Sequence, residues 1–158
     1  MTDLPNSPPI QATEPYDWHA LLTLIQSEFA FMDGRIDPPS SMHRLTADDI
    51  ARQASAEEVW TIGSPPVACV FLTRKGGALY IGKLAVATNQ RGKGLARRLV
   101  DLAAERAKVQ GLSTLELQVR VELTENQHAF AKMGFVETGR TAHAGYDRPT
   151  SITMQKRL

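Results

Sequence analysis

The sequence contains a single cysteine, Cys69, among its 158 residues. One cysteine excludes an intramolecular disulfide framework and any metal site built from several thiolates. No apolar run approaches the roughly 20 residues that a membrane-spanning helix needs. The polar, proline-rich start from Met1 to Pro9 has no basic end leading into an apolar stretch. We therefore expect no secretory signal and a cytoplasmic location.

An excess of one sign of charge is also absent, since 18 basic residues stand against 17 acidic ones for a net charge of +1. No overall field then draws the chain to nucleic acid or to a membrane surface. Its 42% apolar and 22% charged residues are typical of an ordinary soluble globular protein. The length suits one domain with a sizeable core and is short for two.

The N-terminal third is predicted to be an irregular arm followed by two helices. Residues 1–12 form the arm, with a short edge strand near Ile10. Apolar residues at helical spacing predict a helix from Trp18 to Met32. A second, shorter helix is expected from Thr46, a suitable N-cap residue, to about Ala54.

From residue 57 the apolar period changes to two, which is typical of strands. The predicted strands are Glu57–Ile62, Val67–Thr73, Ala78–Val86, Leu115–Val121, Phe135–Thr141 and Thr150–Leu158. Between the third and fourth of them, Gly92–Gln110 carries an apolar arc over about half of the helical wheel, which favours a helix lying flat on a sheet. A short helix is expected from Glu125 to Met133. This order predicts an α/β fold with one strand–helix–strand crossover.

The segment from Leu84 to Ala96 joins a buried strand to the longest helix through a turn that contains two glycines. Backbone N–H groups at such a helix start lack intrahelical partners, and the helix dipole places about half a positive charge there. Glycines allow close approach of an anion, and Arg91 and Lys93 add charge. The segment therefore predicts a cradle for a phosphate or pyrophosphate group.

Two common phosphate-binding loops do not fit this segment. A P-loop needs Ser or Thr directly after Gly-Lys, and Gly94 stands there instead. A dinucleotide fingerprint needs a third glycine where the chain has Arg97.

Two motifs in order carry a resemblance to a known family. Arg91-x-x-Gly94-x-Ala96 follows an apolar strand, and Asn126-x-x-x-Phe130-x-x-x-Gly134-Phe135 follows the next one. This pattern resembles the GNAT superfamily of acyl-CoA-dependent N-acyltransferases, over about residues 57–158. The resemblance implies a mixed, mostly antiparallel twisted sheet of six to seven strands, with about four helices on both faces.

The resemblance also implies a single acyltransferase domain, 1–158, with two regions of different function. Residues 13–56 would form the acceptor side, and residues 57–158 would bind acetyl-CoA as co-substrate, with no metal. The residues implied to bind CoA are Leu84, Ala85 and Val86 along the pantetheine arm, Arg91, Gly92, Lys93, Gly94, Leu95 and Ala96 at the pyrophosphate, and Asn126 and Phe130 on the following helix. Many relatives have tyrosine in place of Phe130 to protonate the departing thiolate, which phenylalanine cannot do.

Transfer to an amine needs a neutral amine and a polarised thioester carbonyl. The backbone N–H of Val86 or of its neighbour is the candidate oxyanion donor. Proton transfer has four candidates: Tyr80 and Glu116 on strands, and His143 and Tyr146 in the loop between the last two strands. Cys69, in mid-strand, is expected to be a small buried hydrophobe rather than a nucleophile.

We therefore expect an acetyl-CoA-dependent N-acetyltransferase that acts on a primary amine of a small molecule or peptide by direct attack in a ternary complex. The alternative is a non-catalytic acyl-CoA-binding or sensing module, which Phe130 motivates. A nucleic-acid-binding domain built on the basic residues 91–98 is disfavoured by the near-zero net charge. Family members are often dimers through their terminal strands, so a homodimer is a further expectation.

Overall fold

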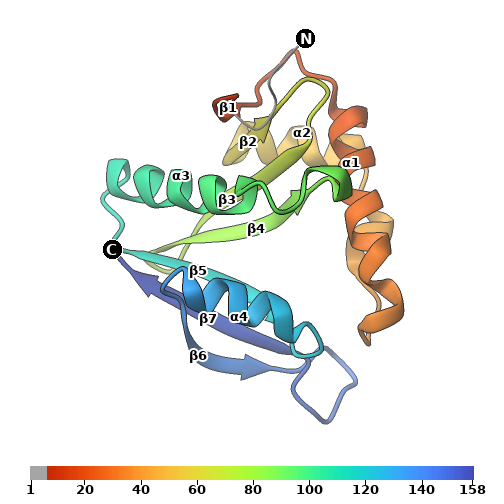
Figure 1. Cartoon of the computed structure of the whole chain (residues 1–158), viewed down its shortest axis with the longest axis vertical. Helices are drawn as coiled ribbons and strands as arrows, with labels where there is room; N and C mark the ends of the chain where they lie inside the picture. Colours follow the sequence, from red (N-terminus) through yellow and green to blue (C-terminus); the bar gives the residue numbers. More distant parts are fainter. Residues whose placement is uncertain (1–6) are drawn as a thin grey trace.

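The computed structural model describes residues 7–158. The helices are α1 (Trp18–Met32), α2 (Ala47–Ala56), α3 (Leu95–Val109) and α4 (Thr124–Lys132), with 3-10 turns η2 (Asp33–Arg35), η3 (Ser41–Arg44) and η4 (Thr88–Gln90). The strands are β1 (Ile10–Gln11), β2 (Glu58–Ile62), β3 (Ala68–Lys75), β4 (Ala78–Val86), β5 (Thr114–Arg120), β6 (Val136–Thr141) and β7 (Ser151–Arg157). Figure 1 shows the arrangement.

Within residues 7–158, seven strands form one sheet in the order β1-β2-β3-β4-β5-β7-β6. Neighbouring strands are antiparallel except β4 and β5, which run parallel. A parallel pair needs a crossover connection, and α3 provides it. The mixed, mostly antiparallel sheet and the four α-helices confirm the predicted fold class.

The helices cover the sheet on both faces. Leu99 of α3 is fully buried against β3 and β4 on one face, where α4 also packs. On the opposite face, Ile25 of α1 and Ile50 of α2 are fully buried over Phe71 of β3. Burial of each such side chain contributes about 1.5–3 kcal/mol. In the described residues, no helix is long and apolar enough to span a membrane.

The structure moves one predicted boundary that matters for the site. Helix α3 begins at Leu95 rather than at Gly92, because Gly92 and Gly94 both have φ of 77°, which an α-helix cannot accommodate. The predicted edge strand near Ile10 is confirmed as β1. The first six residues of the predicted arm lie outside the described part of the chain.

Candidate active site

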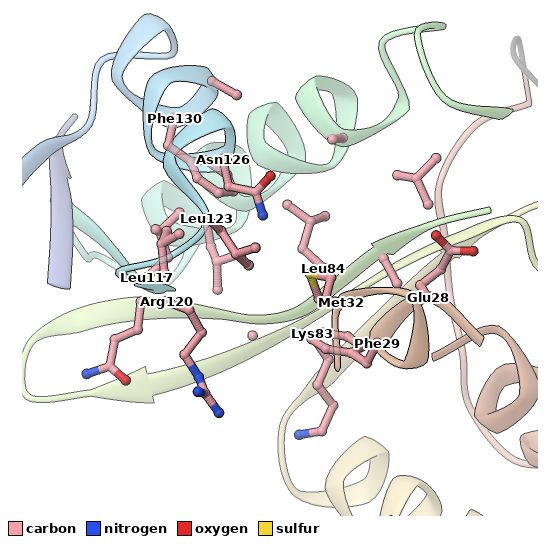
Figure 2. A pocket seen from close by; sticks show the side chains of 18 of the residues that line it. Glu28, Phe29, Met32, Lys83, Leu84, Leu117, Arg120, Leu123, Asn126 and Phe130 are labelled. Carbon is pink, nitrogen blue, oxygen red and sulfur yellow. The ribbon is translucent and has the colours of Figure 1, made fainter. Parts of the chain in front are cut away.

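Strands β4 and β5 run side by side only at their beginnings. Their register holds at Leu79 with Leu115 and at Tyr80 with Glu116, after which the strands separate. Beyond this fork, β5 continues along β7 and β4 along β3. A cavity of about 860 Å³ occupies the gap and extends to α1, α3 and α4. The separation leaves strand backbone facing the cavity (Figure 2).

A bulge in β4 forms the floor of this cavity. Phe71 of β3 pairs with Gly82 and Cys69 pairs with Ala85, so β4 has one more residue than β3 between these pairs. Lys83 lies in the bulge with a left-handed φ of 47°, a conformation that is costly for a residue with a side chain. The extra residue turns the Lys83 side chain onto the face of Phe71, whose ring lies 4.9 Å from the ammonium group.

Past the bulge, strand alternation sets which N–H groups face the cavity. The Ala87 N–H donates to the Val67 carbonyl oxygen of the β3 side at 2.8 Å. Neighbouring residues of a strand direct their N–H groups to opposite sides. The Val86 N–H is therefore directed away from β3, toward the gap between β4 and β5.

The turn after β4 places backbone amides at the cavity wall. The backbone passes through η4 and the left-handed Gly92 and Gly94 before α3 begins. A Cβ atom added to either glycine would meet nothing within 4 Å, so the space in front of the turn is open. Leu95 and Ala96 in the first helical turn have N–H groups without intrahelical partners. The turn thus presents amides and a helix dipole to an open space, as an anion requires.

A buried carboxylate on α1 anchors this turn. The side chain of Glu28 is only 7% exposed and pairs with the Arg91 guanidinium at 2.6 Å. It also accepts hydrogen bonds from the Thr88 N–H and hydroxyl, both at 3.2 Å. The Arg91 guanidinium lies 5.2 Å from the Phe31 ring as well. Arg91 therefore joins the turn to α1, and sequence reasoning missed Glu28 because a lone acid in a helix gives no pattern.

Replacing Glu28 by Gln is expected to lower the free energy of unfolding by about 1 kcal/mol, since the buried acceptor loses its charge-assisted hydrogen bonds. The matched control is Glu125→Gln, which breaks the exposed ion pair between Arg35 and Glu125 and should cost less than Glu28→Gln, because solvent screens exposed ion pairs. Urea unfolding of both variants measures the difference. Equal losses in the two variants would contradict the anchoring role of Glu28.

Helix α4 forms the opposite wall. Asn126 and Phe130 both line the cavity, and Figure 2 shows them across the gap from Leu84 of β4. The Phe130 ring packs edge-on against Phe135 with centroids 5.8 Å apart. The second motif thus places one amide side chain and one apolar ring on the cavity wall.

The strand fork, the glycine turn and the α4 wall follow in the order of a known family. A sequence profile of the Acetyltransferase (GNAT) family matches residues 18–135. The chain belongs to the GNAT acetyltransferase family. A curated relative named "IAA acetyltransferase", from Azospirillum brasilense, is 27% identical over 141 residues, which are 88% of this chain and 91% of that protein.

Solved structures of other GNAT proteins have the same fold. The PaiA N-acetyltransferase of Thermoplasma acidophilum, solved with coenzyme A, has a TM-score of 0.79 at 12% identity and aligns over 95% of this chain and 98% of its own. A GNAT family acetyltransferase from Elizabethkingia anophelis, solved with acetyl-CoA bound, has a TM-score of 0.71 at 16% identity, over 99% and 100%. At such identities the likeness shows the fold alone.

Most of the residues predicted to bind CoA line the cavity of this GNAT protein. They are Leu84, Ala85, Val86, Arg91, Gly92, Gly94, Leu95, Ala96, Asn126 and Phe130. Lys93 is not among the lining residues, and its ammonium group donates to the Gln90 side chain at 3.2 Å. The glycine turn therefore lines the cavity through Arg91, Gly92 and Gly94 and not through Lys93.

Two of the four proton-transfer candidates line the cavity and two do not. Tyr80 and His143 line the cavity, whereas Glu116 and Tyr146 are not among its lining residues. Burial and the neighbouring Glu116 carboxylate raise the pKa of Tyr80, and a hydrogen bond from the Gln118 backbone N–H lowers it. The Glu116 carboxylate itself accepts from Gln155 at 2.8 Å.

Tyr146 lies where two loops of the GNAT domain meet. Its hydroxyl donates to Asp37, in the loop between α1 and α2, at 2.7 Å, and this hydrogen bond raises the pKa of Tyr146. Arg148 reaches the other Asp37 oxygen at 3.1 Å. His143, in the same β6–β7 loop, is held through its ring Nδ1 by the Thr150 hydroxyl. These contacts join the two loops, and His143 of the β6–β7 loop lines the cavity.

Proposed function

We propose that this GNAT protein transfers an acetyl group from acetyl-CoA to a primary amine by direct attack within a ternary complex. The observation that carries the proposal is the fork between β4 and β5, which ends beside a glycine turn and the start of α3. A fork exposes strand amides, and the turn supplies the anion-binding end. An extended ligand with a pyrophosphate next to an amide-containing arm fits this pair of features.

The residues present fit acetyl-CoA along its length. The amides of the Gly92–Ala96 segment would bind the pyrophosphate, where the two left-handed glycines leave open space. The backbone of Leu84–Val86 would pair with the amide-containing pantetheine arm in the manner of a strand. Asn126 on α4 would add a side-chain amide to the same arm.

The chemical step requires one new bond and one broken bond. The neutral amine nitrogen attacks the thioester carbon, so a C–N bond forms, the C–S bond breaks and CoA leaves as its thiolate. The nitrogen releases one N–H proton to solvent as the amide forms. The Val86 N–H would stabilise the negative charge that develops on the carbonyl oxygen. A thiolate is a tolerable leaving group because an unperturbed thiol has a pKa near 8.5, so Phe130 does not prevent turnover.

A basic side chain at the cavity has to remove a proton from the acceptor amine. An alkyl ammonium with a pKa near 10.4 is mostly charged at neutral pH and must lose a proton before it attacks. We assign this step to His143, because it lines the cavity and the Thr150 hydroxyl occupies only one of its two ring nitrogens. Tyr80 also lines the cavity, at the fork, and stays a candidate for proton transfer.

Release of CoA thiol, measured against a panel of primary amines, tests the function. We expect amine-dependent release together with an acetylated product of the added mass. Cys69 is fully buried, and burial raises the pKa of its thiol to about 12, so a thiol reagent reads released CoA without a background from the folded protein. Saturable CoA binding without turnover on any amine would favour the sensing module instead.

A further inference from the structure

More basic than acidic side chains line the cavity, so some of its positive charge has no carboxylate partner. Its two acidic lining residues, Glu28 and Glu125, are each held in an ion pair with an arginine. Lys83 and Arg120 also line the cavity. Among residues 7–158, no carboxylate forms an ion pair with either of these two cations. A half-buried cation without a counter-ion costs free energy unless a ligand supplies the charge.

Both the backbone conformation and the burial of Lys83 cost free energy. Its backbone is left-handed, as described above, and burial lowers the pKa of its ammonium group. One N–H of that group donates to the Gln53 side-chain oxygen at 3.2 Å, which leaves two donors. The acid that acts on it from α2, Asp49, is engaged in its own capping box and in an ion pair with Arg52. Non-glycine residues in such strained backbone cluster at functional sites.

Arg120 occupies the other side of the fork, at the end of β5. It donates to the Pro38 carbonyl oxygen at 2.6 Å and to the Pro39 carbonyl oxygen at 3.3 Å. Both acceptors are neutral, so the guanidinium keeps its full charge and further N–H donors. Figure 2 shows Arg120 and Lys83 pointing to the same side of the sheet, away from Asn126 and Phe130 of α4.

We propose that the acceptor amine of this protein carries an anionic group of its own, a carboxylate or a phosphate, which Lys83 and Arg120 bind. The inference rests on the proposed function and names the substrate class for the same cavity. The pair lies on the side of the fork opposite α4, so an anion held there leaves the α4 wall and glycine turn to acetyl-CoA. Arg97 is the third lining cation that forms no ion pair with a carboxylate of residues 7–158, and it belongs to the start of α3 and to the proposed phosphate end.

Matched acceptors test this assignment. The free amino acids phenylalanine and methionine are compared with their amides, and 2-aminoethylphosphonate is compared with ethylamine. Each rate is divided by the concentration of the neutral amine. We expect the wild type to prefer the anionic member of a pair by about 100-fold in kcat/KM, since each charged hydrogen bond contributes about tenfold or more. Lys83→Met and Arg120→Gln should each lower that ratio about tenfold.

The controls are Lys108→Met and Arg74→Gln, which remove exposed cations of the same types from α3 and β3 and should keep the wild-type ratio. Stabilisation by CoA, measured in all four variants, shows that each is folded and binds the co-substrate. Turnover of amines with equal kcat/KM for anionic and neutral partners would overturn the inference and leave the proposed function standing. So would a preference that survives in both cavity variants. Absence of turnover on every amine would overturn the proposed function itself.

Discussion

Gly94→Asp should weaken CoA binding by at least 100-fold while leaving the apoprotein folded. The new carboxylate would stand at the start of α3, against the pyrophosphate that we assign to this turn. No atom lies within 4 Å of an added Cβ, so steric overlap does not contribute. The left-handed φ of 77° costs a residue with a side chain about 1–2 kcal/mol, and a negative charge at the start of a helix offsets part of this cost.

Thermal unfolding with and without CoA measures both effects. CoA at 100 times its Kd should stabilise the wild type by about 2.7 kcal/mol, and the Gly94→Asp variant should show almost none of this. Gly94→Asn is the matched control, because asparagine tolerates the left-handed region and carries no charge. Gly145→Asp places the same side chain at another left-handed glycine, in the β6–β7 loop. Unaltered CoA affinity in Gly94→Asp would show that the turn is not the cradle.

Val86→Pro should lower kcat by 10²- to 10³-fold, which is the usual loss when one oxyanion donor is removed. Proline lacks the N–H, and this N–H is directed away from β3, so no bond of the β3–β4 ladder is lost. Proline is tolerated in a strand when its nitrogen does not face a neighbouring strand. The substitution therefore removes the donor and retains the sheet.

Val86→Ala separates the donor from the side chain, since it trims the half-buried isopropyl group and keeps the N–H. We expect its kcat to stay within a few fold of the wild type. Single-turnover rates at saturating acetyl-CoA and acceptor provide the comparison, because both variants are then fully loaded. If Val86→Pro and Val86→Ala reacted at similar rates, the carbonyl would have to be polarised by another group.

The fold was largely predictable because its elements are marked locally. Apolar residues alternate from Leu115 to Val121 and form a broad arc on the longest helix, because each element buries one face. A buried face gives a periodic pattern of apolar residues in the sequence. The left-handed glycines before α3 were visible as glycines, but their exclusion from the helix was not. The 3-10 turns between α1 and α2 had no periodic signal and were not predicted.

The candidate site was predictable in part. The strand–turn–helix segment around Gly94 is marked by its residue types and their order, and its residues Gly92 and Gly94 line the cavity. Lys83 was visible only as the residue that breaks an apolar run, and Arg120 belonged to an ordinary polar strand face. Their shared cavity depends on a bulge in β4 and on the separation of β4 from β5, which no local pattern encodes.

The sequence by itself determined the α/β order and the glycine turn between a buried strand and the longest helix, because both are marked by residues close along the chain. Only the tertiary structure decided that Glu28 anchors Arg91, that His143 and Tyr80 line the cavity while Glu116 and Tyr146 do not, and that Lys83 and Arg120 line it without carboxylate partners in the described residues. Such relations join residues 60 or more positions apart. Long-range packing and charge pairing bring these residues together.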